Sequence, residues 1–135
     1  MSHAVVQCVQ AAIEKIDVST YKIPTDSPES DGTYEWKSTT LVVVEAHASN
    51  EIGLGYTYAD GSTARLIHDK LAHAIQGLDA LAVPLAWETM VETIRNLGRP
   101  GIGSMAISAV DAALWDLKAK LLGLPLAALL GAVRD

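Results

Sequence analysis

The stretch SMAISAVDAALWDLKAKLLGLPLAALLG, residues 104–131, organises the rest of the chain. Its apolar residues recur at steps of three and four, which predicts one buried face of an α-helix: Ile107, Val110, Leu114, Leu117 and Leu121. We expect Ser104 to cap the start of this helix and Gly123 to end it. Asp116 and Lys120 stand one turn apart, in the order that favours an ion pair. A short helical segment, LAALLG, should follow.

The residue identities in this stretch also match a signature of one enzyme group, at the same spacing and without a gap. The matching residues are Ala106, Ser108, Ala109, Val110, Asp111, Ala113, Leu114, Asp116, Leu117, Ala119, Lys120, Pro125, Leu126, Leu129, Leu130 and Gly131. The chain therefore resembles the mandelate racemase/muconate lactonizing branch of the enolase superfamily. The resemblance implies an N-terminal α+β capping domain, which in this family precedes a modified (β/α) barrel that carries the chemistry.

Length and composition limit what the chain can be. Its 135 residues, of which 50% are apolar, suit a single domain with a real core. A (β/α)₈ barrel needs about 250 residues, so we expect the barrel to be absent from this chain. The net charge of −6 argues against nucleic acid and anionic membranes as partners. Cys8 is the one cysteine, which excludes an internal disulfide and favours a cytoplasmic location.

The N-terminal half predicts a three-stranded sheet. We expect residues 1–12 to be a flexible extension and residues 13–135 to form the capping domain, with residues 103–131 leading toward the barrel. Alternating or continuous apolar residues predict strands at 13–21, 39–48 and 52–58, the second being central and most buried. Prolines and small polar residues predict a long loop over 22–38. Gly53 and Gly55 share one face of the third strand and permit close approach of a backbone or ligand.

Two further helices should lie between the strands and the signature helix. The first follows the cap sequence at residues 60–63 and is ended by Gly77, with the apolar face Ala64, Ile67, Leu71, Ala74 and Ile75. The second is opened by Pro84 and ended by Gly98, with the buried stripe Trp87, Met90, Val91, Ile94 and Leu97. The predicted fold class is α+β: a three-stranded antiparallel meander followed by a three-helix bundle, as in an enolase-type N-terminal capping domain.

We assign no catalytic residue and no metal ligand to this chain. The family uses a Lys-x-Lys pair on a barrel strand, but Lys118 and Lys120 lie on a predicted helix, about 200° apart around its axis. His68 and His73 have the wrong helical spacing for shared metal ligands, and His47 beside Glu45 fits a solvent-facing strand. The resemblance implies that Mg²⁺ is bound by the barrel rather than by this chain.

Four residues are candidates for substrate binding. The segment from Ile23 to Trp36 and the stretch 55–58 correspond in chain position to the two family loops that close over the barrel mouth. The candidates are Tyr56, Tyr58, Ile23 and Thr25. The tyrosines offer large, rigid rings with one polar tip each. The alternative is that both rings pack on the sheet as ordinary strand aromatics.

Two functions stay open. In the first, the chain is the capping, specificity-determining part of an Mg²⁺-dependent enzyme that abstracts the proton α to a carboxylate: a racemase, a cycloisomerase or an acid-sugar dehydratase. Its partners would be a barrel domain or second polypeptide and a small carboxylate substrate, the complete enzyme would be a homo-oligomer, and the chain alone would be inactive. In the second, it is a stand-alone interaction or scaffold domain, or a truncated fragment, whose exposed apolar surface needs a cover.

The helix periodicity makes a prediction about stability. Leu114→Ala should lower the free energy of unfolding by about 2–5 kcal/mol, because it removes a large side chain from the centre of the buried face. Lys118→Ala should change it by less than about 0.5 kcal/mol, as expected for a surface position. Denaturant titrations of both variants test the assignment, and equal losses would show that the helix face is wrong.

Overall fold

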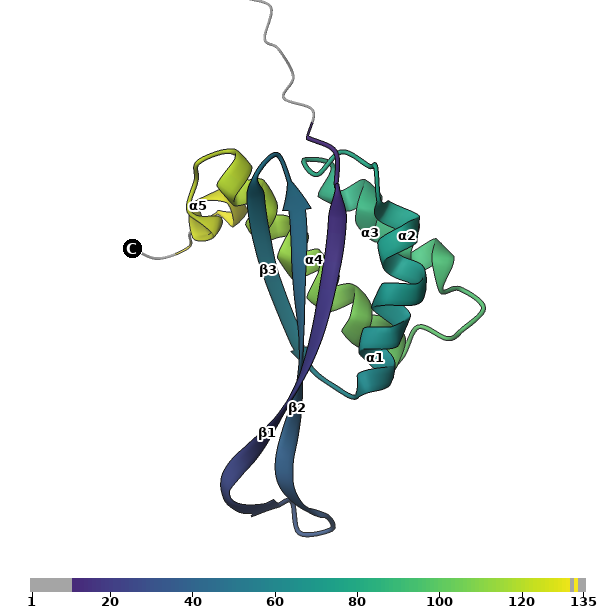
Figure 1. Ribbon diagram of the computed structural model, residues 1–135, viewed down its shortest axis with the longest axis vertical. Coiled ribbons are helices and arrows are strands. Elements are labelled where there is room, and N and C mark those ends of the chain that lie inside the picture. The colour runs from purple at the N-terminus through teal and green to yellow at the C-terminus, as the bar shows by residue number, and fades with distance from the viewer. Residues whose placement is uncertain (1–10, 132, 134–135) are drawn as a thin grey trace, which may run out of the picture.

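The computed structural model describes residues 11–131 and Val133. One antiparallel sheet, in the order β1-β2-β3, is covered on one face by helices (Figure 1). The predicted fold class is confirmed. Residues 1–10 of the expected flexible extension lie outside the described part. Ala11, the first described residue, already belongs to the packed domain, because it is buried and its carbonyl accepts a hydrogen bond from Ala80 N–H at 2.7 Å.

The three strands are β1 (Lys15–Ser30), β2 (Glu35–Ala48) and β3 (Glu51–Tyr58), and β2 is central as predicted. The tight connection between β2 and β3 is made by Ser49 and Asn50, which both have positive φ (48° and 67°), as a type I′ hairpin turn requires. From Val42 to the end of β2 the inward face is apolar and buried: Val42, Val44, Ala46 and Ala48.

The prediction of a long loop over residues 22–38 is wrong, because β1 and β2 continue as one extended hairpin that projects beyond the helices (Figure 1). A register shift between Pro24 and Glu29 absorbs the proline-containing segment. Prolines are tolerated there because β1 is an edge strand. At the tip, the Asp31 carboxylate accepts hydrogen bonds from the N–H groups of Thr33 and Tyr34, both at 2.9 Å. A hydrogen bond from the Thr33 hydroxyl, together with these two bonds, lowers the pKa of Asp31.

The first predicted helix is a continuous helical rod made of α1 (Gly61–Leu66), the π-helical turn η1 (Ile67–Leu71) and α2 (Ala72–Ile75). Asp60 caps it by accepting a hydrogen bond from Ser62 N–H at 2.9 Å. Ile67, Leu71 and Ile75 are fully buried, which confirms the predicted apolar face.

The next helix, α3 (Val83–Thr93), buries Val83, Ala86 and Met90, with Ile94 just beyond its end. The sequence pattern predicts that Trp87 and Leu97 belong to the buried stripe. That prediction is wrong, because the two residues are 39% and 56% exposed. The Arg99 guanidinium lies 5.0 Å from the Trp87 ring centre and partly shields it from water.

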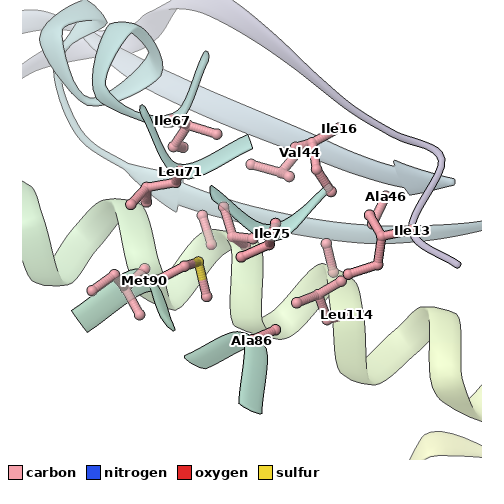
Figure 2. Packing of buried hydrophobic residues seen from close by; sticks show 14 of the residues in the cluster. Ile13, Ile16, Val44, Ala46, Ile67, Leu71, Ile75, Ala86, Met90 and Leu114 are labelled. Atoms are coloured by element: carbon pink, nitrogen blue, oxygen red, sulfur yellow. The ribbon is translucent and has the colours of Figure 1, made fainter. Parts of the chain in front are cut away.

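The signature helix is α4 (Ile102–Leu121), and the short α5 (Leu126–Leu130) follows it. The predicted face is confirmed, with Ile107, Val110, Leu114 and Leu117 buried in the common core with the other helices and the sheet (Figure 2). The predicted cap is wrong: α4 begins two residues before Ser104, whose hydroxyl instead donates to the Arg99 carbonyl at 2.7 Å. Although α4 is the longest described helix, neither it nor any other described helix has the apolar length needed to cross a bilayer.

The contact between α4 and β3 is unusually close. A Cβ atom added at Gly53 would lie 2.1 Å from the Ala113 carbonyl oxygen, and one at Gly55 would lie 2.1 Å from the Ala109 carbonyl oxygen. The prediction that these glycines admit another backbone is therefore confirmed, and that backbone is α4.

Two side chains of α4 complete this contact by hydrogen bonding to the free edge of β3. The Asp116 carboxylate accepts from Leu54 N–H at 2.8 Å, and Lys120 Nζ donates to the Ile52 carbonyl at 2.7 Å. The predicted ion pair between Asp116 and Lys120 is also present, at 2.7 Å. Partial burial of Asp116 opposes ionisation, but the bonds from Lys120 and Leu54 outweigh it and hold the pKa of Asp116 below its usual value.

The close approach predicts that Gly53→Ala destabilises the chain by about 1–3 kcal/mol, because the new methyl group would force α4 away from β3. Gly61→Ala is the matched control, since a Cβ there meets nothing within 4 Å. Because alanine favours the helical conformation, the control should be neutral or stabilising by up to about 1 kcal/mol. Equal melting temperatures for the two variants would contradict the proposed packing.

Candidate functional site

The outward face of the sheet carries the candidate substrate-binding residues. Side chains alternate across a strand, so burial of one face of β2 directs the other set outward. The register of the three strands arranges this outward set in rows. Going toward the hairpin tip, one row contains Ser19, Val43 and Tyr56. The next row contains Tyr21, Leu41 and Tyr58, and the one after it contains Ile23 and Thr39. This end of the face is therefore mostly apolar and rich in tyrosine.

The two tyrosines of β3 lie side by side on this surface. Tyr56 and Tyr58 are 59% and 62% exposed, and their rings meet edge to face with centroids 6.2 Å apart. Edge-to-face contact is a favourable geometry for aromatic pairs, so each ring helps to fix the other. Two rigid rings with their flanks open to solvent form a platform on which a partner or a substrate can pack.

Ile23 lies one row further toward the hairpin tip than Tyr58, on the same face, and is 41% exposed. Thr25 follows in the segment where the β1 register shifts. Its hydroxyl oxygen is buried and has no hydrogen-bond partner in the part of the chain that the structure describes. An unsatisfied buried hydroxyl is costly, so a hydrogen-bond partner brought to this position would be favourable. The structure thus gathers three of the four candidates on one face and places the fourth next to them.

Lys118 and Lys120 are engaged in structural contacts. Besides its bonds to Asp116 and β3, Lys120 contributes a positive charge to the last turn of α4, where the helix dipole favours it. Lys118 Nζ lies 5.0 Å from the centre of the Trp115 ring, a cation–π contact.

Two arrangements were missed from the sequence. Asp17, Glu45 and His47 come together on the outward face at the end opposite the hairpin tip, although His47 was interpreted as an ordinary solvent-facing residue. The cross-strand register brings Asp17 opposite Glu45, and that pairing cannot be read from local spacing.

The second arrangement missed from the sequence is a shallow hollow between α3 and α4, lined in part by Trp87, Arg99 and Asp111. Burial there raises the pKa of Asp111.

The comparisons with known proteins agree on one family. Residues 12–131 match the model of the mandelate racemase/muconate lactonizing enzyme N-terminal domain. A mandelate racemase/muconate lactonizing enzyme-like protein from Rubrobacter xylanophilus has a similar structure, with a TM-score of 0.85 and 58% identity, covering 87% of this chain and 33% of that one. L-Talarate/galactarate dehydratase from Salmonella typhimurium strain LT2 is 34% identical over 133 residues, which cover 91% of this chain and 33% of the enzyme.

A second similar structure is L-talarate dehydratase from Polaromonas sp. JS666, complexed with Mg and L-glucarate. Its TM-score is 0.84 at 29% identity, covering 93% of this chain and 36% of that one. The chain therefore spans about one third of the length of the relatives it matches. The likeness that residues 106–131 suggested is confirmed across nearly the whole chain: the protein belongs to the mandelate racemase/muconate lactonizing enzyme family, as an N-terminal capping domain of the enolase superfamily.

Proposed function

We propose that this chain is the capping part of an Mg²⁺-dependent enzyme that abstracts the proton α to a carboxylate, and that it acts together with a (β/α) barrel. The observation that carries the proposal is the match of residues 12–131 to the family's N-terminal domain. Relatives of known activity include an acid-sugar dehydratase, and a similar structure holds Mg and an acid-sugar dianion, L-glucarate. A small carboxylate, of the acid-sugar class in the first instance, is the corresponding substrate.

The chemistry itself is assigned to the barrel. Among the described residues, the one cluster that could hold a metal ion includes His47, whereas Mg²⁺ prefers a shell made only of oxygen atoms. This cluster does not fit Mg²⁺. A barrel that binds Mg²⁺ would supply the positive charge that makes loss of the α proton easier.

The chain's own contribution is to cover and shape the substrate pocket. Tyr56 and Tyr58 provide rigid ring surfaces and hydroxyl groups, Ile23 extends the apolar surface, and the Thr25 hydroxyl can bond a polar group of the substrate. Excluding water from the site strengthens the electrostatic interactions made there and prevents side reactions. These residues would therefore determine which carboxylate is accepted, not whether its proton is removed.

The end of the chain offers a second surface for the barrel. After α4, the leucines at 122, 124 and 130 are 44%, 47% and 59% exposed. Clustered apolar residues of this kind mark interaction surfaces in soluble proteins. We assign this segment to barrel contact. The alternative function, a scaffold domain without chemistry, would use the same apolar surface for another partner and would show no carboxylate chemistry with any barrel.

Complementation with a barrel polypeptide tests the proposal. Mixed with a family barrel, the chain should restore Mg²⁺-dependent exchange of the α proton of an acid-sugar carboxylate with solvent deuterium, followed by NMR. The chain alone should show neither this exchange nor a micromolar Mg²⁺ site by calorimetry. If the chain binds the barrel but the mixture shows no exchange of the α proton, the scaffold function is favoured.

The tyrosine platform makes a sharper prediction. Tyr58→Ala and Tyr56→Ala should change the ratio of kcat/KM values between carboxylates of different size by about tenfold or more, because such ratios depend on pocket contacts. Complex formation with the barrel should be unchanged. Leu85→Ala is the matched control, because Leu85 is 50% exposed but lies on α3. If both tyrosine variants keep the wild-type preference, the rings are ordinary sheet aromatics.

A further inference from the structure

A second group of functional side chains lies on the outward face of the sheet, at the end away from the hairpin tip. Asp17 of β1 pairs directly with Glu45 of β2, and His47 follows two residues later on the same face. The carboxylate and imidazole ligand atoms of these three residues all lie within 4.8 Å of one another. The proposed capping function uses none of them.

We propose that Asp17, Glu45 and His47 form a binding site for one divalent transition-metal ion of the zinc class. Imidazole nitrogen and carboxylate oxygen are both established zinc ligands, and three protein ligands leave a fourth position for water. The mixed donor set favours zinc and its neighbours over Mg²⁺ and Ca²⁺, which select oxygen. All three ligands project from two paired strands, so the sheet holds their backbone positions without help from a loop.

The distance between two of the ligands fits a metal site. His47 Nε2 lies 3.2 Å from Asp17 Oδ2. Two ligand atoms, each about 2.0–2.2 Å from a tetrahedral zinc ion, are roughly 3.3–3.6 Å apart. The imidazole and carboxylate therefore already have nearly the separation that a shared ion requires.

The imidazole of His47 is also available to coordinate a metal ion. His47 Nε2 is buried and makes no hydrogen bond within the described residues, so its 3.2 Å contact with Asp17 does not have hydrogen-bond geometry. A shared metal ion lies to one side of the line between two ligand atoms, whereas a hydrogen atom lies close to that line. The orientation of the ring thus suits coordination better than it suits a hydrogen bond to Asp17.

The charges at this position favour a cation. Asp17 and Glu45 face each other directly across an antiparallel pair, where like charges are destabilising. Lys15 now supplies one positive charge, with Nζ 2.6 Å from the same Asp17 oxygen that His47 approaches. The Lys15 side chain is 62% exposed, so its ammonium group can move into water when a metal ion binds. Lys15 is therefore a competitor of the metal ion.

This competition separates the metal site from a simple network of ion pairs. If the cluster binds metal, removing the Lys15 charge should tighten metal binding. If the cluster is only an ion-pair network, the same change removes a favourable contact and confers no metal affinity. The chain also contains a matched control, because His68 Nδ1 lies 2.7 Å from Asp69 Oδ1 on an exposed helix surface that forms no three-ligand cluster in the described part of the chain.

The experiment uses the untagged 135-residue chain with Cys8→Ser, since the one thiol could bind zinc by itself. Zinc is titrated by calorimetry, and Co²⁺ serves as a spectroscopic probe of coordination through its visible absorption.

We expect one ion per chain, a raised melting temperature, and tighter binding for Lys15→Met. Asp17→Asn and His47→Gln should each weaken binding by at least about tenfold, because loss of a direct ligand exceeds the 10- to 100-fold effect of outer-shell partners. His68→Gln should bind like the parent chain.

The variants change surface side chains, so each should keep its melting temperature in the absence of metal to within a few degrees. Glu45→Gln serves as the ligand variant if Asp17→Asn fails to fold. No saturable zinc binding by the parent chain, equal affinity in the His47→Gln and parent chains, or weaker binding by Lys15→Met would each overturn the proposal.

Discussion

The structure depends on the contact between the backbones of β3 and α4. Because Gly53 and Gly55 have no side chains, the carbonyl groups of Ala109 and Ala113 can approach the strand directly. This brings Asp116 and Lys120 within reach of the free edge of β3. It also means that almost all the side-chain bulk of β3 points the other way, as Ile52, Leu54, Tyr56 and Tyr58. Close packing on one side of the strand and an exposed, tyrosine-bearing surface on the other are thus two results of the same pattern.

Much of this fold could be predicted because the elements concerned have strong local patterns. The periodicity around Leu114, the apolar run at 41–44 that marks the central strand and the two glycines of β3 all led to the observed packing. The hairpin at 22–38 was missed because its prolines lie on an edge strand and in a register shift, where they do not interrupt a central ladder. Trp87 was misplaced because periodicity predicts which residues share a face, while the position of Arg99 beside it depends on tertiary structure.

The outward face was harder to predict because its composition depends on strand pairing. Local sequence places Tyr56 and Tyr58 on one face, but only the register sets Tyr58 beside Leu41 and Asp17 opposite Glu45. A shift of one residue would turn every side chain of a strand to the opposite face. Burial of Val42 and Val44 excludes such a shift. The same core residues that stabilise the sheet therefore also define the surface on which the candidate contacts lie.

The two edges of the sheet have different means of preventing polymerisation. An exposed strand edge can recruit a strand from another molecule, and proteins counter this with prolines, lysines and irregular strands or by covering the edge. The edge of β3 is occupied in part by Asp116 and Lys120. The edge strand β1 instead contains Lys15, Lys22, two prolines and a shifted register. A long hairpin that reaches beyond its own core therefore carries, along its own edge, the features that oppose pairing with a strand of another molecule.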